Sequence, residues 1–324
     1  MNLTQNRRSF LKMALAVAAA LPARITALAP DVATSKINHS ALTVIDTHTH
    51  FYDPQRPQGV PWPPKDDPLL YRTVLPKEYR ALKTPVPVTG TVVVEASSWI
   101  EDNQWILDLA ANDPFIVGFV GNLPVGTDAF AKHLGRFAQN RLFRGIRIGG
   151  DLLKQNLGEQ RFLADLKQLA RRDLALDLLG GPELLTGASR LTREIPDLRI
   201  IIDHLAGVPI DGRAPDAEWK RAMEMAAEHP LICCKVSGLV EGTGRTDGTA
   251  PRDVAFYAPA LDVVWNAFGE DRLIYGSNWP VSARFADLAT VQQIVLDYFS
   301  AKRSPVLKKI FAGNAKRIYK WISR

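Results

Sequence analysis

Three polar side chains alternate along one short apolar segment near the N-terminus. Residues 43–50 read TVIDTHTH, so Asp46, His48 and His50 are two residues apart. Residues with this spacing share one face of a β-strand, so we expect both imidazoles to leave the strand end together. Neutral imidazole is a common metal ligand and titrates near neutral pH, so the pair suits metal binding or proton transfer. Two buried histidines with satisfied hydrogen bonds are the alternative.

Short apolar segments alternate with longer helix-like segments along the rest of the chain. Several apolar segments, such as 91–94 and 199–202, are apolar on both faces, as strands buried in a parallel sheet are. We predict helices between the strands, with a break at Pro259 because proline removes a helical hydrogen bond. The strands are predicted at 43–50, 91–97, 115–123, 143–149, 174–180, 199–207, 231–239 and 272–280, and the helices at 103–112, 127–140, 159–172, 182–195, 215–229, 252–268, 284–300 and 305–322.

This order of elements is typical of a single-domain α/β fold, the (β/α)8 TIM barrel, which needs eight strand–helix units in roughly 250 residues. A doubly wound sheet normally leads with a Gly-rich phosphate loop, and none follows the first predicted strand. The active site of such a barrel lies at the C-terminal ends of the strands. We predict that the polar residues at those ends form it, namely His48, His50, Glu95, Arg147, His204, Lys235 and Asn278.

The first 29 residues resemble a twin-arginine export signal in front of the barrel. Arg7 and Arg8 are followed by the apolar stretch 13–21 and then by Ala-Leu-Ala at 27–29, which is typical of a cleavage site. The stretch is too short to span a bilayer, and a disordered basic terminus or an uncleaved anchor is the alternative. We therefore expect the twin-arginine machinery to export the protein to the periplasm, with a linker at 30–42 and the barrel at 43–324.

Charge and cysteine content argue against two classes of protein. Removal of residues 1–29 lowers the net charge from +6 to +2, because the segment holds four basic residues and no acidic one. The remainder has no basic stripe or nucleic-acid motif, so we expect no nucleic-acid partner. Cys233 and Cys234 are adjacent and provide no framework of structural disulfides. No heptad or repeat indicates a partner chain, so the oligomeric state stays open.

Five motifs in order along the chain resemble the landmarks of one family. They are 44–51 (VIDTHTHF), 202–207 (IDHLAG), 235–238 (KVSG), 276–280 (GSNWP) and 313–315 (GNA). Together they resemble the amidohydrolase-related superfamily, and within it the branch of sugar-acid lactonases and 2-pyrone-4,6-dicarboxylate lactonases. The resemblance covers nearly all of the chain after the signal. It implies a TIM barrel with hydrolytic chemistry at the strand ends, and a divalent metal in some members only.

Three residues depart from the family pattern. Asn278 stands where relatives usually have the Asp of a Gly-Ser-Asp-Trp motif, which serves as general base or metal ligand. A carboxamide neither accepts a proton near neutral pH nor brings negative charge to a cation. Asp177 stands where metal-dependent relatives often have a His, and Arg147 stands where binuclear members have a bridging lysine. The resemblance therefore argues against a binuclear zinc centre.

Two interpretations of the metal question stay open. His48, His50 and His204 could hold one divalent metal such as zinc, with Glu95 as a further ligand or as a base. Without a metal, a general base and a preorganised oxyanion site suffice to open an activated ester.

The residues at the strand ends suggest how water could be activated. We predict that His204 or a strand-1 histidine is the base, with Glu95 as the competing base. Lys235 and Arg147 would hold the carbonyl oxygen or a substrate carboxylate. A structural ion pair of these two cations with Glu95 or Asp203 is the alternative.

The connection at 51–87 is long for a compact barrel and rich in proline. Loops of this length are usually functional or disordered, so we predict an ordered lid, with the Gly-rich stretch 238–248 as a second, mobile loop at the mouth. Aromatic side chains of the loop could lie against a sugar or aromatic ring of the substrate, with Arg72 bound to an anionic group of it. Alternatively, these side chains could simply pack the loop onto the barrel. The residues predicted to bind substrate are Arg147, Trp62, Tyr71, Arg72, Trp99 and Trp279.

These observations together predict an exported hydrolase. It would open a lactone or cyclic ester of a small, anionic, carboxylated or sugar-acid substrate by attack of water. A decarboxylase-type lyase of the same superfamily is one alternative, because the spacing of the motifs does not distinguish the two reactions. A non-catalytic binding protein that lost its base at Asn278 is the other.

Overall fold

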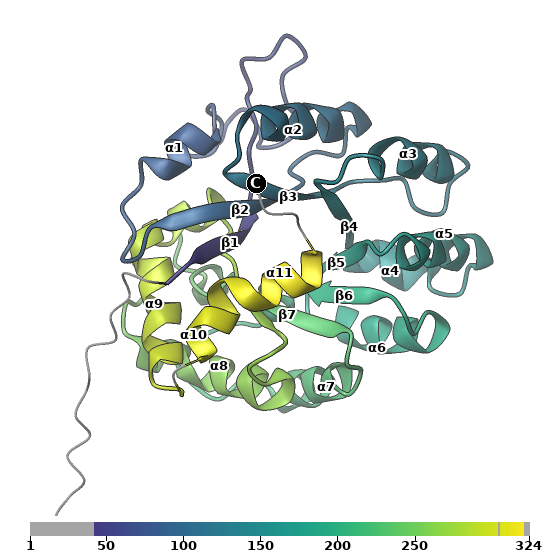
Figure 1. Ribbon diagram of the computed structural model, residues 1–324. Helices are drawn as coiled ribbons and strands as arrows, with labels where there is room; N and C mark the ends of the chain where they lie inside the picture. The colour runs from purple at the N-terminus through teal and green to yellow at the C-terminus, as the bar shows by residue number, and fades with distance from the viewer. Residues whose placement is uncertain (1–41, 304, 321–324) are drawn as a thin grey trace, which may run out of the picture. The chain divides into compact units, whose positions relative to one another are not determined.

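Figure 1 shows the computed structural model of the chain, which describes residues 42–303 and 305–320. All of them belong to one compact unit, Asn38–Arg324. The predicted export signal at 1–29 and all but the last residue of the predicted linker lie outside the described residues. Within the described ranges, no helix is long and apolar enough to cross a membrane.

Eight parallel strands form a barrel in which each strand pairs with the next one along the chain (Figure 1). The ring is nearly closed between its last and first strands, because beyond their ends the His50 N–H donates to the Trp279 carbonyl oxygen at 2.9 Å. The predicted TIM barrel is therefore confirmed. The strands are β1 (Val44–Thr49), β2 (Val88–Val94), β3 (Ile116–Gly121), β4 (Phe143–Gly149), β5 (Ala175–Leu179), β6 (Arg199–Ile202), β7 (Ile232–Val236) and β8 (Leu273–Tyr275).

Helices surround the strands, as the alternating pattern predicts (Figure 1). The break predicted at Pro259 is wrong, because α8 (Val254–Phe268) continues through it. A proline there removes one hydrogen bond, while the buried side chains of Tyr257, Leu261 and Val264 anchor the helix in the core. The other helices are α1 (Pro76–Arg80), α2 (Ile100–Asn112), α3 (Phe130–Phe137), α4 (Gly150–Asn156), α5 (Gln160–Arg171), α6 (Leu184–Glu194), α7 (Ala217–Ala227), α9 (Leu288–Ser300), α10 (Val306–Lys308) and α11 (Asn314–Tyr319), with short turns η2 (Asp203–Gly207), η3 (Glu241–Thr243), η4 (Val281–Arg284) and η5 (Lys309–Gly313).

Helix α11 closes the end of the barrel at which the strands begin, and in Figure 1 it crosses in front of them. Ala315, Ile318 and Tyr319 join the apolar side chains inside the ring. Arg144 and Arg199, at the starts of β4 and β6, donate to the carbonyl oxygens of Tyr319 and Ile318 at 2.6 and 2.9 Å. The C-terminal ends of the strands therefore lie at the opposite end of the barrel, where a TIM barrel places its active site.

Candidate active site

Strand β1 carries His48 and His50 to the C-terminal end of the barrel but directs Asp46 elsewhere. The β1–β2 register shifts directly after Asp46. The Asp46 carboxylate accepts hydrogen bonds from the Tyr79 hydroxyl at 2.7 Å, the Ser277 N–H at 2.8 Å and the His48 N–H at 3.0 Å. The expectation that all three polar side chains share one face is therefore wrong for Asp46, because the irregularity interrupts the two-residue period. Asp46 instead fixes the backbone from which His48 projects.

A left-handed turn after β6 orients His204. The φ angles of His204, Leu205 and Ala206 are 54°, 52° and 53°, a conformation that costs non-glycine residues roughly 1 kcal/mol or more each. The turn brings His204 Nδ1 to 2.8 Å from Ser237 Oγ. Gly238 permits this packing, because a Cβ there would lie 2.5 Å from His204 Cβ. Backbone strain is thus used to hold one imidazole in place.

A fully buried charge cluster supports the imidazoles. Lys235 Nζ lies 2.5 Å from Asp177 Oδ2, 3.0 Å from Asp203 Oδ1 and 3.3 Å from His48 Nδ1. Burial alone would raise the pKa of Asp203, but Lys235 and His48 outweigh this effect and hold that pKa well below its usual value. Lys235 therefore forms with Asp203 the structural ion pair that is the predicted alternative to a substrate contact, and sequence reasoning missed Asp177 as its second partner.

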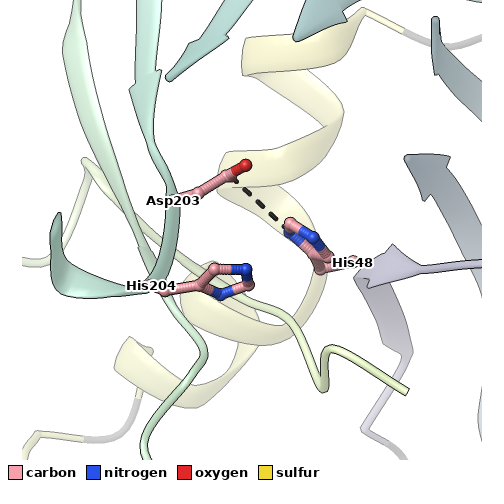
Figure 2. A group of neighbouring side chains, drawn as sticks. All are labelled: His48, Asp203 and His204. Carbon is pink, nitrogen blue, oxygen red and sulfur yellow. Dashed lines mark ion pairs between the residues drawn. The ribbon is translucent and has the colours of Figure 1, made fainter. Parts of the chain in front are cut away.

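His48, Asp203 and His204 form a possible cation site, with one donor atom of each within 4.8 Å of the others. Figure 2 shows the Asp203 carboxylate directed at His48. Two imidazoles and a carboxylate resemble the protein ligands of a mononuclear zinc. The surrounding charge does not fit, because Lys235 lies 3.3 Å from His48 Nδ1 and Arg147 Nη1 lies 3.4 Å from His48 Nε2. His48 Nδ1 therefore faces Lys235 as well as Asp203, and Nε2 faces Arg147, so a cationic side chain lies beside each nitrogen and would repel a divalent ion there.

His50, the third predicted metal ligand, lies outside this group. Its Nδ1 is 3.0 Å from the Val94 carbonyl oxygen, and its Nε2 is 3.2 Å from Asn278 Oδ1. Burial, assisted by Arg147, lowers the pKa of His50 to about 3. Burial also lowers the pKa of His204 to about 4, although the Asp203 carboxylate opposes the shift. Both imidazoles are therefore neutral at pH 7.

A cavity of about 450 Å³ lies where the strands end, within the range of about 300–1,000 Å³ usual for small-molecule sites. His48 and Lys235 are buried and are not among the described residues that line it. Glu241, which sequence reasoning did not select, is part of the wall. Its place in the predicted mouth loop 238–248, after β7 and at the active-site end of the barrel, is the signal that could have selected it. The predicted residues in the wall are His50, Trp62, Glu95, Arg147, His204 and Asn278.

Arg147 and Glu95 form an ion pair in this wall. Arg147 Nε donates to Glu95 Oε1 at 2.8 Å, and Nη2 donates to the Glu95 carbonyl at 2.7 Å. The alternative interpretation of Arg147 as a structural partner of Glu95 therefore holds for two of its three nitrogens. Nη1, which faces His48 Nε2, is the nitrogen left for a ligand.

Four residues predicted to bind substrate lie outside the cavity wall. Trp279 is 3% exposed and packs edge-on against the rings of Phe51 and Tyr79. Arg72 donates to two carbonyl oxygens of its own loop. Trp99 is 39% exposed at the start of α2, and Tyr71 lies in the loop without lining the cavity. Of the aromatic residues predicted to bind substrate, Trp62 is the one that reaches the cavity, with its ring centroid 6.0 Å from that of His50.

The chain is similar to several known proteins in sequence and in fold. The chain matches the amidohydrolase family over residues 45–321. An L-fucono-1,5-lactonase from Burkholderia ambifaria is 32% identical over 289 residues, which cover 85% of this chain and 95% of that protein. An amidohydrolase structure from Burkholderia multivorans, solved with bound zinc, has a TM-score of 0.77 at 24% identity and covers 86% of this chain and 100% of that one. A putative 2-pyrone-4,6-dicarboxylic acid hydrolase from Pseudomonas putida has a TM-score of 0.68 at 19% identity, covering 86% and 98%.

Some of these similarities bear on the fold alone, and others bear on the family and its reaction. The two solved structures are less than 25% identical to this chain and bear on the barrel alone. The lactonase relative supports the predicted hydrolase, and a small-molecule substrate, over the decarboxylase-type lyase and the non-catalytic binder. The chain belongs to the amidohydrolase family, in which it is a hydrolase of the lactonase type.

Proposed function

We propose that the protein opens the lactone ring of a sugar acid by attack of water. The Burkholderia ambifaria relative is named for a substrate of this class, L-fucono-1,5-lactone. The observation that carries the proposal is the cavity that holds two neutral imidazoles, His50 and His204, beside one guanidinium. A neutral imidazole can donate a hydrogen bond to a lactone carbonyl or accept one from a sugar hydroxyl. The ring of Trp62 offers an apolar face to the sugar.

The charge of the cavity favours one carboxylate in the ligand. Arg147 is the arginine among the described lining residues, and two of its three nitrogens are bound to Glu95. Its Nη1 can bind the single carboxylate that ring opening of a sugar lactone produces. A pyrone dicarboxylate would bring two further carboxylates to the same nitrogen. We therefore place sugar-acid lactones above pyrone dicarboxylates as substrates.

We also propose that hydrolysis does not depend on a metal. A divalent cation at His48, Asp203 and His204 would need surroundings without positive charge. Lys235 and Arg147 lie there instead. Neutral His204 can polarise the carbonyl group instead, because the Ser237 hydroxyl can donate to its Nδ1 and leave the proton on Nε2.

Acid release from a panel of sugar-acid lactones and pyrone dicarboxylate lactones tests both proposals. We expect turnover of 1,5-lactones of sugar acids, at a rate that changes less than twofold after treatment with a chelator. Loss of activity on chelation and its return with zinc would contradict the metal-independent mechanism. Absence of turnover on every lactone would contradict the proposed function.

Export by the twin-arginine machinery is a further proposal, and residues 1–29 support it through Arg7, Arg8 and the apolar stretch behind them. The double substitution Arg7→Lys and Arg8→Lys keeps the charge but removes the arginine pair. We expect it to move the protein from the periplasmic to the cytoplasmic fraction of the expressing bacterium. Arg24→Lys, in the same segment, is the matched control, and equal export of the double variant and this control would contradict the proposal.

A further inference from the structure

The cavity contains one carboxylate that the mechanism above does not use. Glu241 begins η3, in the stretch 238–248 that was predicted to be a mobile loop. The Gly242 N–H donates to the Gly238 carbonyl at 3.0 Å, and the Ile210 N–H donates to the Gly242 carbonyl at 2.8 Å. A Cβ at Gly242 would lie 2.9 Å from the Val208 carbonyl oxygen, so the turn packs closely on the segment after β6. Glu241 is therefore presented to the cavity by a turn with defined hydrogen bonds.

The two carboxylate oxygens of Glu241 have different surroundings. Oε1 accepts a hydrogen bond from Asn278 Nδ2 at 2.8 Å. Oε2 is buried and has no hydrogen-bond partner among the residues that the structure describes. A buried oxygen without a partner is rare in proteins and calls for a ligand or a chemical role. Asn278 thus holds one oxygen, and the other has no partner among the described residues although Glu241 lines the cavity.

The neighbours of Glu241 leave it as the best-suited proton acceptor. His50 and His204 share the cavity wall, but protein groups already hold their nitrogens. The two nitrogens of His50 lie 3.0 and 3.2 Å from the Val94 carbonyl oxygen and Asn278 Oδ1, and His204 Nδ1 lies 2.8 Å from Ser237 Oγ. Glu95, in the same wall, is bound to Arg147. Burial raises the pKa of Glu241 to about 7, against the effect of its hydrogen bonds. Tyr257 of α8 lies close enough for the charge of Glu241 to raise the pKa of its hydroxyl, after the larger effect of burial.

We propose that Glu241 is the general base of the lactonase reaction, with Asn278 as the residue that positions its carboxylate. The inference rests on the proposed lactone hydrolysis and names the residue that transfers its proton. Oε2 removes a proton from water as the water oxygen bonds to the lactone carbonyl carbon. The tetrahedral intermediate then breaks the ring C–O bond, and the Glu241 carboxyl returns the proton to the departing ring oxygen. The product is a hydroxy acid, and Glu241 is regenerated as the carboxylate.

The substitution Glu241→Gln tests this role. Glutamine keeps an oxygen that can accept from Asn278 but cannot take up a proton. We expect kcat/KM to fall by at least about 100-fold. In the wild type, kcat/KM should rise as the pH increases through about 7, because Glu241 ionises there. This rising limb of the pH–rate profile should be absent from the variant. Glu224→Gln, on the exposed surface of α7, is the matched control and should leave both the rate and the limb unchanged.

A second variant separates a catalytic role from a structural one. Adding Asn278→Asp to Glu241→Gln returns a carboxylate to the cavity wall, at the side chain that contacts residue 241, so we expect at least a tenfold recovery of kcat/KM. If kcat/KM does not recover in the double variant, Glu241 has a structural role. If Glu241→Gln alone keeps the wild-type rate and the same pH profile, the inference is overturned while lactone hydrolysis stands. A wild-type enzyme without turnover on any lactone would overturn the proposed function, and this inference with it.

Discussion

Replacement of Lys235 with Met should lower the free energy of unfolding at pH 8 by about 3–5 kcal/mol. The ammonium lies 2.5 Å from Asp177 and 3.0 Å from Asp203, and all three side chains are fully buried. Methionine has a similar length but no charge, so the variant leaves two carboxylates in the barrel without a cation. Unfolding in denaturant at fixed pH measures the loss. Lys220→Met, whose side chain is 55% exposed, is the matched control and should change the free energy by less than about 0.5 kcal/mol.

The pH dependence of this loss identifies its cause. In the wild type the pKa of Asp203 is depressed, so its ionised form stabilises the fold above the unfolded value of 3.8, and this contribution is lost as pH falls through the folded pKa. Burial raises the pKa of Asp177 to about 6 even beside Lys235. Without Lys235, we expect the pKa of Asp177 to rise further and that of Asp203 to rise above its usual value. Folding then favours their protonated forms, and the stability of the variant falls as pH rises through those raised values. The difference from wild type should therefore be small near pH 4 and largest above pH 7.

Neutralising one of the two acids gives the decisive comparison. The double variant Lys235→Met with Asp177→Asn carries one buried carboxylate instead of two, so it should recover part of the lost stability, and it remains measurable if the single variant fails to fold. A single variant within about 1 kcal/mol of wild type at pH 8 would contradict the assignment of Lys235 as the counter-ion of this cluster.

Much of the barrel could be predicted from sequence because buried parallel strands are apolar on both faces. Segments such as 91–94 and 199–202 could not be mistaken for strands that face water. Strand ends were less accurate where the chain leaves the regular β conformation. Strand β6 ends at Ile202 instead of 207, because the next residues enter the left-handed turn that orients His204. Nothing in the types of these residues indicates positive φ at His204, Leu205 and Ala206, since such turns usually use glycine or asparagine.

The site was predictable as a position but not as a set of contacts. A TIM barrel places polar residues at strand ends in one region, so His50, Arg147 and Asn278 meet there as expected. Whether a side chain faces the cavity or a neighbour depends on long-range packing that sequence spacing does not encode. Trp279 is the clearest case, because it lies one residue after Asn278 yet packs edge-on against Phe51 and Tyr79. Glu241 is the converse case, since its partner Asn278 is 37 residues away.

Replacement of His204 with Asn should reduce kcat/KM for a sugar-acid lactone by about 10²–10³-fold, the usual effect of removing one donor to a developing oxyanion. The neutral imidazole lines the cavity and lies 2.8 Å from Ser237, which fixes its orientation. Asparagine is the substitution best suited to this backbone, because it tolerates the φ of 54° better than other non-glycine residues. Its shorter side chain can still reach Ser237 but withdraws the Nε2 donor from the cavity.

Stability and activity should therefore separate in this variant. We expect the free energy of unfolding of His204→Asn to stay within about 1 kcal/mol of wild type, because the turn and its contact with Gly238 are kept. His133→Asn, on the outer helix α3, is the matched control and should keep full turnover. If His204→Asn also keeps full turnover, His204 has no part in the chemistry.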